Sequence, residues 1–525
     1  MLDTLVVGAG QAGLATSYWL GRAGVEHQLL ERRAALGGAW QDRWDAFCLN
    51  TPNFSLTLPG MPYDGPVPEA FMPRNDLIEY FRHYAEAIDA PVRTDTDVTR
   101  IAPAEDGSFR VETPHGSWRA RNVVLATGGY QKPKVPALSA RLPGHVLQLH
   151  TDDYRNPEQL PDGAVLIVGT GQSGGQIAEE LLDAGREIHL AVSTCPEAPR
   201  RYRGQDIIFW MMHLAQYGPG YGLNGLTLGQ LPSPAARFMC NPLVSGAGGG
   251  HDIHLRDFGR RGVRLHGHLE AADDGELTFS DDLPERLGVV ERTFYQRMRP
   301  MFDSYIAATG MAAPDADPPR KDDWLPAEAA SLNLGAENIT AVIWSTGYRL
   351  DFGILDIPVL DQWNYPRHHR GVTEHPGLYA VGLPWLTGHG SSIVAGVGRD
   401  ARFIAEHIAA ADVGYPAQSP SKSTGAASPA ALNHSVAHAW TEGSASCSAT
   451  SSGGPSNTDF PSSRYSPVLL PASSPKSAGW SMKGSSPPSP SVSTPQREVN
   501  SEKSSGRSPR SSASGQAPPS SCIRR

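Results

Sequence analysis

Three glycines near the N-terminus have the spacing of a loop that binds a dinucleotide phosphate. Gly8, Gly10 and Gly13 follow the apolar stretch LVV and precede the helical pattern QAGLATSYWL. The first glycine allows a tight turn, the second lets a pyrophosphate approach the backbone, and the third lets the helix pack against the strand. The next predicted strand ends at Glu31, whose carboxylate can accept hydrogen bonds from both hydroxyls of a ribose. The alternative is a structural glycine turn beside a surface glutamate.

The same spacing occurs a second time in the middle of the chain. Gly169, Gly171 and Gly174 follow VLIV, and the next predicted strand ends in Ser193 instead of an acid. Three arginines come soon after that strand: Arg200, Arg201 and Arg203. A carboxylate would repel the 2′-phosphate of NADPH, whereas a guanidinium group can bind it, so this site is predicted to prefer NADPH to NADH. The alternative for the arginines is a solvated loop.

Two such turns in one chain predict two dinucleotides. A cofactor held tightly by the first turn and a diffusible hydride donor held by the second would make a flavin–nicotinamide enzyme. In such an enzyme the protein places the nicotinamide against the flavin ring. A disulfide reductase of this kind is disfavoured, because the five cysteines include no C-x-x-C pair.

The elements that must position these turns alternate between strand and helix. A helical pattern over 11–24 follows the first turn, and a second strand–turn–helix begins at residue 164. This alternation predicts an α/β fold with parallel sheets that helices cover on both faces. Residues 205–246 and 284–310 are expected to be mostly helical and to form lids or packing layers. The predicted strands are 2–7, 25–31, 109–112, 122–126, 164–168, 187–193, 340–345 and 377–381.

Composition restricts the classes of protein that remain. Hydrophobic residues make up 39% and charged residues 19% of the 525, an ordinary globular balance. The net charge is −9; ten Lys/Arg and four Asp/Glu after Asp412 give the tail +6 and leave residues 1–412 at −15. This acidic body argues against a nucleic-acid partner. Residues 413–525 are rich in Ser, Pro, Gly and Ala, so this tail is predicted to be disordered.

Cysteine spacing and hydropathy point to a cytoplasmic protein. Five widely spaced cysteines predict neither a disulfide framework nor a structural zinc site. The histidines in HDIH at 251–254 and HGH at 266–268 are interpreted as polar loop residues, so no metal site is expected. No apolar run is long enough to span a bilayer, and no room for a signal peptide precedes the first strand.

Four further segments complete a pattern known from one enzyme family. GGAW occupies 37–40, ATG occupies 126–128, STGY occupies 345–348, and GLYAVGLPWLTGHGSSIVAGVGRDA spans 377–401. Together with the two glycine turns, these segments resemble the class B flavin-dependent monooxygenases. That family includes the flavin-containing monooxygenases, the plant YUCCA enzymes and bacterial CzcO-like flavoproteins. The resemblance covers nearly all of residues 1–412.

The resemblance implies two Rossmann-like domains, with an NADPH-binding domain inserted into an FAD-binding domain. The expected FAD-binding parts are 1–159 and 349–412, the NADPH-binding domain with its helical insertions is 160–348, and the tail is 413–525. The expected cofactors are FAD and NADPH. Their contacts are expected from Gly8, Gly10, Gln11, Ala12, Gly13, Glu31, Gly38, Trp40, Ala126, Thr127, Gly128, Gly169, Gly171, Gln172, Ser173, Gly174, Ser193, Arg200, Arg201, Thr346, Gly347, Gly382 and Ser391.

The resemblance also implies a reaction. NADPH would reduce FAD, dioxygen would add at flavin C4a to give a (hydro)peroxide, and an oxygen atom would pass to a small molecule. The substrate would be a nitrogen or sulfur nucleophile or a carbonyl compound. Asn50 aligns loosely with an asparagine that the family places beside the reactive flavin edge; the alternative is a turn asparagine before Thr51 and Pro52.

The linker before the second turn matches the family only in part. His150 and Tyr154 keep the H-x-x-x-Y spacing of its fingerprint and are taken as catalytic candidates. Leu142 stands where phenylalanine is expected, and Gly144 lies two residues too far from the histidine. Tyrosine instead of tryptophan disfavours a Baeyer–Villiger enzyme. Oxygen insertion therefore stays open.

Two alternatives to a monooxygenase remain. The first is an FAD- and NADPH-dependent reductase or dehydrogenase that passes electrons to a quinone or another acceptor. The second is a noncatalytic sensor that binds nucleotides. For the leading hypothesis the partners are a small-molecule substrate and dioxygen, and a homodimer is compatible with the sequence.

Overall fold

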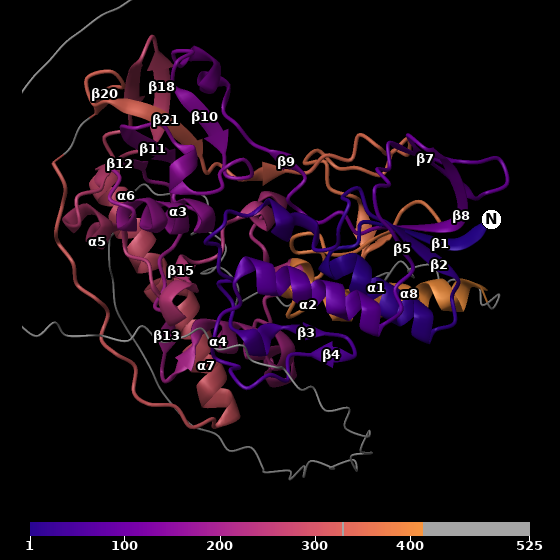
Figure 1. Ribbon diagram of the computed structural model, residues 1–525. Coiled ribbons are helices and arrows are strands. Elements are labelled where there is room, and N and C mark those ends of the chain that lie inside the picture. The colour runs from indigo at the N-terminus through magenta and orange to yellow at the C-terminus, as the bar shows by residue number, and fades with distance from the viewer. Residues whose placement is uncertain (328–329, 413–525) are drawn as a thin grey trace, which may run out of the picture. The chain divides into compact units, whose positions relative to one another are not determined.

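Two sheets with parallel cores organise the residues that the computed structural model describes, 1–327 and 330–412 (Figure 1). In the nine-stranded first sheet, the central strand β1 (Leu2–Val7) pairs in parallel with β2 (His27–Leu30) and with β8 (Gly116–Leu125). Its parallel part has the order β5–β2–β1–β8–β25. The remaining strands are β5 (Val92–Arg93), β6 (Arg100–Pro103), β7 (Phe109–Thr113), β23 (His368–His369), β24 (Val372–Thr373) and β25 (Leu378–Ala380).

The second sheet has five strands, all parallel, in the order β10–β21–β11–β12–β17. Its central strand β11 (Ala164–Val168) lies between β12 (Ile188–Ala191) and β21 (Ile339–Trp344). The outer strands are β10 (Leu147–His150) and β17 (Arg264–His266). In both sheets the strand that leads into a glycine turn is therefore central. The strand order reverses beside it, which is where open parallel sheets form a crevice at their carboxyl ends.

Helices cover the sheets because each one presents an apolar face. Helix α1 (Gln11–Arg22) packs against α8 (Val397–Asp412) and α2 (Arg74–Ala87) (Figure 1). Helix α3 (Gln172–Asp183) follows β11 and packs on the second sheet. The other helices are α4 (Ile207–Tyr217), α5 (Leu255–Arg260), α6 (Leu283–Thr293) and α7 (Arg299–Thr309), with a π-helical turn at Phe294–Met298.

Shorter strands lie outside these two sheets. A three-stranded antiparallel sheet contains β18 (Leu269–Asp273), β19 (Glu276–Phe279) and β20 (Ser331–Asn333). Pairs of short strands make up the rest: β3 (Thr57–Leu58) with β4 (Met61–Pro62), β9 (Lys132–Pro133) with β22 (Tyr348–Arg349), β13 (Arg201–Tyr202) with β14 (Gln205–Asp206), and β15 (Val244–Ser245) with β16 (His251–Asp252). Within the described residues, no helix is long and apolar enough to cross a membrane.

The α/β prediction is confirmed, and every predicted strand overlaps an observed one. The helical prediction for 284–310 is also confirmed, by α6, the π-helical turn and α7. The prediction for 205–246 is confirmed only in part, because α4 is the one α-helix in that range and the helical segments after it are short 3₁₀ turns. Glycines and prolines after Tyr217, beginning with GPG, end the helix and favour turns. The predicted disordered tail, 413–525, lies outside the described residues.

Candidate functional site

The first glycine turn leaves space where a phosphate would approach the backbone. Gly8 has φ +103°, and a Cβ on it would lie 2.7 Å from the Ala126 carbonyl oxygen. A Cβ on Gly13 would lie 1.9 Å from the Gly8 carbonyl oxygen, so helix and strand need glycine at both places. A Cβ on Gly10 would meet only the Cα of Gly38, at 4.0 Å. Packing therefore does not require glycine at residue 10, whereas close approach of a pyrophosphate would.

The second glycine turn repeats this geometry. Gly169 has φ +102°, and a Cβ on it would lie 2.5 Å from the Ser345 carbonyl oxygen. A Cβ on Gly174 would lie 2.0 Å from the Gly169 carbonyl oxygen, and a Cβ on Gly171 would have no neighbour within 4 Å. Both turns thus fit a dinucleotide by the same test, an open position at the second glycine.

The helices that follow the two turns keep their first N–H groups available to an anion. Gly10 and Gly171 are the N-caps of α1 and α3, and neither helix has a side-chain cap or an acidic residue in its first turn. Ala12 and Ser173 lie in these first turns. Unpaired N–H groups and the positive end of the helix dipole together favour a phosphate.

The residues after the second strand of each sheet differ between the two turns. The buried Glu31 carboxylate accepts hydrogen bonds from the backbone N–H of Ala9, at 2.9 Å, and of Arg33, at 3.1 Å. At the corresponding place the Ser193 hydroxyl lies 2.9 Å from that of Thr170, and it accepts the Thr170 N–H at 3.3 Å. Both side chains therefore contact a glycine turn, but only the first is an anion.

Two remote segments meet at the first residue of α1. The indole N–H of Trp40 donates to the Gln11 side-chain oxygen at 3.1 Å, and the Gln11 amide donates to the Ser392 carbonyl at 3.0 Å. A Cβ on Gly382 would lie 2.3 Å from the Cβ of Ala12, so the C-terminal segment also contacts this turn of helix. The GGAW and C-terminal segments are thus brought to the first glycine turn.

Ser391 shapes the C-terminal segment. Its buried hydroxyl accepts hydrogen bonds from the N–H groups of Thr387, at 3.0 Å, and Gly388, at 3.2 Å. In this arrangement the side chain holds a backbone turn, so a cofactor contact from Ser391 stays a prediction.

The ATG and STG segments lie where the chain crosses between the two sheets. Ala126, Thr127 and Gly128 directly follow β8, and Thr346 and Gly347 follow β21. The crossings pair with each other: β9 and β22 are antiparallel, and the Lys134 N–H donates to the Gly347 carbonyl at 2.9 Å. The Thr127 hydroxyl accepts from the Gln131 amide at 2.7 Å, and the Thr346 hydroxyl donates to the Lys134 carbonyl.

His150 joins the linker to the second crossing. Its Nδ1 accepts the Asp152 N–H at 3.3 Å, which leaves the proton on Nε2 to donate to the Gly347 carbonyl at 3.1 Å. Burial lowers the pKa of this imidazole. The neutral ring therefore fixes the end of β10 against the residue that follows β21.

Tyr154 and Asn50 have separate surroundings. Tyr154 is fully buried, its hydroxyl donates to Glu180 at 3.2 Å, and burial raises its pKa. The Asn50 carbonyl accepts a hydrogen bond from Arg200 at 2.7 Å. Among the described residues, no hydrogen bond joins Asn50 to His150 or Tyr154. The roles that the contacts support for His150 and Tyr154 are positional, and catalytic roles for the three residues stay predictions.

The structure corrects the expectation for Arg200. Arg200 is 4% exposed, and its guanidinium donates to Asp206 at 2.7 Å and to the Asn50 carbonyl at 2.7 Å. These buried partners leave it unavailable to an external phosphate, and the sequence did not reveal them because Asn50 is remote in the chain. The Arg201 side chain is 59% exposed, with Glu69 at 3.8 Å, and it stays available.

One buried cation at the crossing was not predicted. Arg43 lies over the rings of Tyr130, at 4.8 Å, and Tyr348, at 5.8 Å, and donates to the Tyr348 hydroxyl at 3.1 Å. That hydroxyl donates in turn to Asp152. The only sequence signal for this cluster was an arginine three residues after GGAW. That signal was not sufficient, because the partners of Arg43 lie on three other segments. This cluster holds both crossings and the linker together.

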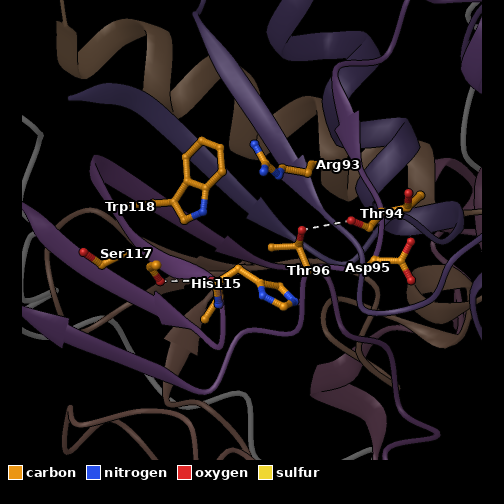
Figure 2. Close-up of a pocket in the computed structure, with 9 residues that line it drawn as sticks. Arg93, Thr94, Asp95, Thr96, His115, Ser117 and Trp118 are labelled. Carbon is orange, nitrogen blue, oxygen red and sulfur yellow. Dashed lines mark hydrogen bonds between the residues drawn. The ribbon is translucent and has the colours of Figure 1, made fainter.

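A surface hollow is lined by residues of the first sheet and its loops. Figure 2 shows Arg93, Thr94, Asp95 and Thr96 facing His115, Ser117 and Trp118 across it. Its lining includes no residue of either glycine turn, of the crossings or of the C-terminal segment. No cofactor is assigned to it.

Comparison with known proteins identifies the family. A family model described as pyridine nucleotide-disulphide oxidoreductase matches residues 5–203. A CzcO-like uncharacterized oxidoreductase of Geobacillus kaustophilus is 30% identical over 411 residues, covering 78% of this chain and 98% of the relative. The indole-3-pyruvate monooxygenase YUCCA1 of Oryza sativa subsp. japonica is 30% identical over 219 residues, covering 41% of this chain and 54% of that enzyme. A solved flavin-containing monooxygenase from Stenotrophomonas maltophilia has a TM-score of 0.52 at 20% identity, over 78% of this chain and 99% of that one, and shares the fold.

Fold and glycine turns place the chain among oxidoreductases of the pyridine-nucleotide type. It belongs to the family of class B flavin-dependent monooxygenases and CzcO-like oxidoreductases. The protein is accordingly an enzyme, a flavin-dependent oxidoreductase. The predicted family and enzyme class are confirmed, and the assignment of FAD and NADPH stays a prediction.

Proposed function

We propose that the chain is an NADPH-consuming monooxygenase that transfers one oxygen atom of dioxygen to a small organic molecule in the cytoplasm. The substrate class is a nitrogen or sulfur nucleophile or a carbonyl compound. The observation that carries the proposal is the pair of glycine turns. Each has an open second glycine and an uncapped helix, and each lies at the reversal of strand order in a parallel sheet.

The first turn is assigned to FAD. Glu31 follows β2 and carries a buried carboxylate 2.9 Å from the Ala9 N–H, in position to accept ribose hydroxyls. Gln11 is held by Trp40 and by the Ser392 carbonyl, so two remote segments close over the same turn. Such enclosure suits a cofactor that stays bound through turnover.

The second turn is assigned to NADPH. Ser193 replaces the acid, which removes the charge that would repel a 2′-phosphate. Arg201 offers an exposed guanidinium on the segment that follows β12. The domains proposed on this basis are FAD-binding parts at 1–159 and 349–412, with a Rossmann-like NADPH-binding domain at 160–348. A homodimer stays a prediction.

The residues of the chain bind, orient and shield, and the flavin supplies hydride acceptance from NADPH and activation of dioxygen. His150, with its neutral ring on the Gly347 carbonyl, and Arg43, beneath Tyr348, hold the crossings at fixed positions. We expect this bracing to set how the nicotinamide half approaches the flavin half. Asn50 stays a proposed residue of the flavin edge.

Purified full-length protein tests the assignment directly. We expect bound FAD, bleaching of its absorbance by NADPH at lower concentrations than by NADH, and substrate-dependent NADPH consumption. Reactions under ¹⁸O₂ with amines, thioethers and indole-type acids should give one labelled product, with one ¹⁸O atom per molecule by mass spectrometry.

The reductase alternative makes a different prediction for the same experiment. NADPH would be consumed, a quinone would be reduced at a comparable rate, and no product would carry ¹⁸O. That result would reject oxygen transfer but keep the flavin and NADPH assignments. A protein that binds nucleotide without any bleaching of its flavin by NADPH would reject both.

A further inference from the structure

Two cysteines far apart in the sequence meet beside the second glycine turn. The buried Cys195 lies just after β12, and its thiol donates to the Asn241 carbonyl at 3.2 Å. The Leu243 N–H donates to the Pro196 carbonyl at 2.8 Å, so the segments that follow the two cysteines run side by side. Cys240 is exposed and is the residue directly before Asn241. The two cysteines do not have C-x-x-C spacing, so the sequence did not predict this pair.

The two thiols differ in protonation. The interaction between them raises the pKa of Cys195 and lowers the pKa of Cys240, and burial raises the pKa of Cys195 further. The exposed Cys240 is therefore the sulfur that more readily becomes a thiolate, next to a Cys195 thiol that keeps its proton. An exposed thiolate beside a second thiol is the arrangement in which a peroxide-sensitive cysteine and its resolving cysteine work.

We propose that Cys195 and Cys240 form a peroxide-reactive dithiol that closes to a disulfide and pins the segment 240–244 over the second glycine turn. The bond does not depend on the proposed function; only its effect on NADPH does.

The chemistry balances with hydrogen peroxide as the oxidant. The Cys240 thiolate attacks one peroxide oxygen; its S–O bond forms as the O–O bond breaks, and hydroxide takes a proton to leave as water. The Cys195 sulfur then attacks the Cys240 sulfur; the S–S bond forms, the S–O bond breaks, and a second water leaves with the thiol proton. Two thiols lose two electrons in total, and one peroxide is reduced to two waters.

The position of the pair gives the bond a consequence. The Gln172 side chain, at the start of α3, donates to the Val244 carbonyl and accepts the Val244 N–H at 3.3 Å. Ser193, which contacts the second glycine turn, accepts the Cys195 N–H at 3.4 Å. A covalent link from 195 to 240 would fix the segment that Gln172 already holds at one end. We expect that fixing this segment hinders the entry of a nucleotide at the turn, so oxidation should slow NADPH binding.

Peptide mapping under non-reducing conditions tests the bond. The FAD-loaded full-length protein is treated with one to ten equivalents of hydrogen peroxide, alkylated, and digested with trypsin. We expect a linked species of peptides 187–200 and 238–256, two hydrogens lighter than their sum and separated by dithiothreitol. The rate of flavin bleaching by NADPH should fall several-fold on oxidation and recover on reduction.

Three variants make the result specific. Cys240→Ser and Cys195→Ser should give no linked peptide and a bleaching rate that peroxide does not change, with Cys195→Ser leaving Cys240 as a sulfenic acid that dimedone traps. Cys48→Ser, a free and half-buried cysteine elsewhere, should behave as wild type. Far-ultraviolet circular dichroism and flavin content verify that each variant is folded.

Other outcomes would overturn the proposal. Cys240 found as a sulfinic acid, or linked to any cysteine except Cys195, would show that the pair does not close. A linked peptide with an unchanged bleaching rate would show that the disulfide forms but does not hold the segment 240–244 over the second glycine turn. Absence of flavin bleaching by NADPH even before oxidation would count against the proposed function. The disulfide would then be tested by the peptide mapping alone.

Discussion

The two glycine turns have the same backbone geometry but differ in the residues that surround them. The first glycines have φ +103° and +102°, and a Cβ on the third glycine would lie 1.9 Å or 2.0 Å from the carbonyl oxygen of the first. Around the first turn, Trp40 and the Ser392 carbonyl both contact Gln11. Around the second, the side-chain hydrogen bonds of Gln172 within the described residues go to one segment, at Val244. Two segments thus contact the start of the helix at the first turn, and one does so at the second. This difference suits a dinucleotide that stays bound at the first turn and one that exchanges at the second.

The largest effect is expected from filling the third glycine of each turn. Alanine at Gly13 or Gly174 would place Cβ inside the contact distance of a backbone carbonyl, so the helix must move away from its strand. Such overpacking costs about 1–3 kcal/mol of the free energy of unfolding. We expect Gly13→Ala to lose bound FAD and Gly174→Ala to keep FAD but lose bleaching by NADPH. Flavin absorbance and urea unfolding measure the two effects.

Gly144→Ala is the matched control for both variants. This glycine of the linker has an ordinary φ, and a Cβ on it would meet nothing within 4 Å. It should retain FAD, NADPH bleaching and stability. If Gly174→Ala lost FAD as readily as Gly13→Ala, the separate roles of the two turns would be refuted.

The sequence was sufficient for the turns because each depends on local chemistry. Strand, glycine spacing and helix follow one another within a dozen residues, so Gly8 to Gly13 and Gly169 to Gly174 could be placed on the correct elements. The alternation of strands and helices predicted parallel sheets, whereas the central positions of β1 and β11 came from the structure.

The surroundings of the turns could not be read in the same way. Arg200 looked like a phosphate ligand, but it is satisfied by Asp206 and by the carbonyl of Asn50, which is remote in sequence. Cys195 and Cys240 lie on segments that only the tertiary fold brings together. A partner far along the chain leaves no periodic or spacing signal, so contacts of this kind require the structure.

The second glycine of each turn separates ligand binding from packing. Gly10 has φ −77° and Gly171 has φ −67°, both open to alanine, and a Cβ would meet little or nothing. Stability should therefore be unchanged in Gly10→Ala and Gly171→Ala. Since a methyl group would occupy the space of the pyrophosphate, we expect an affinity loss of about tenfold or more, roughly 1.4 kcal/mol, for FAD in the first variant and NADPH in the second.

Equilibrium dialysis of FAD and titration of NADPH bleaching measure these losses, with thermal unfolding of the cofactor-free proteins as the check on packing. Unchanged FAD affinity in Gly10→Ala would mean that no phosphate approaches the first turn closely.

A smaller effect is expected where the charges of the two sites differ. Arg201→Ala should raise the KM for NADPH about fivefold to tenfold and leave the KM for NADH nearly unchanged, because one charge-assisted hydrogen bond to the 2′-phosphate is lost. Arg402→Ala on α8, where the side chain is equally exposed at 59%, is the control and should change neither constant. Equal changes for both nucleotides would contradict the 2′-phosphate assignment.

The smallest effect concerns a histidine in the second strand of each sheet. His189 on β12 is buried with its Nδ1 3.0 Å from Nε2 of His266, and burial first, then the neighbouring charges, lower its pKa from 6.5 to about 3. His27 on β2 is half-buried, with Ser17 at 2.8 Å and the Val25 carbonyl at 2.9 Å, and burial lowers its pKa as well. Both rings are neutral in the folded protein at neutral pH.

The sign of the pH effect follows from these shifts. Between about pH 6.5 and pH 3, the unfolded chain binds a proton at residue 189 and the folded protein does not, so stability falls as the pH falls. The contribution is at most about 1.4 kcal/mol per pH unit. We expect His189→Gln to lose less stability than wild type between pH 7.5 and 5.5 in urea unfolding, and His27→Gln to differ from wild type by less. A larger change from His27→Gln would show that the histidine with the more strongly lowered pKa lies in the first sheet and not in the second.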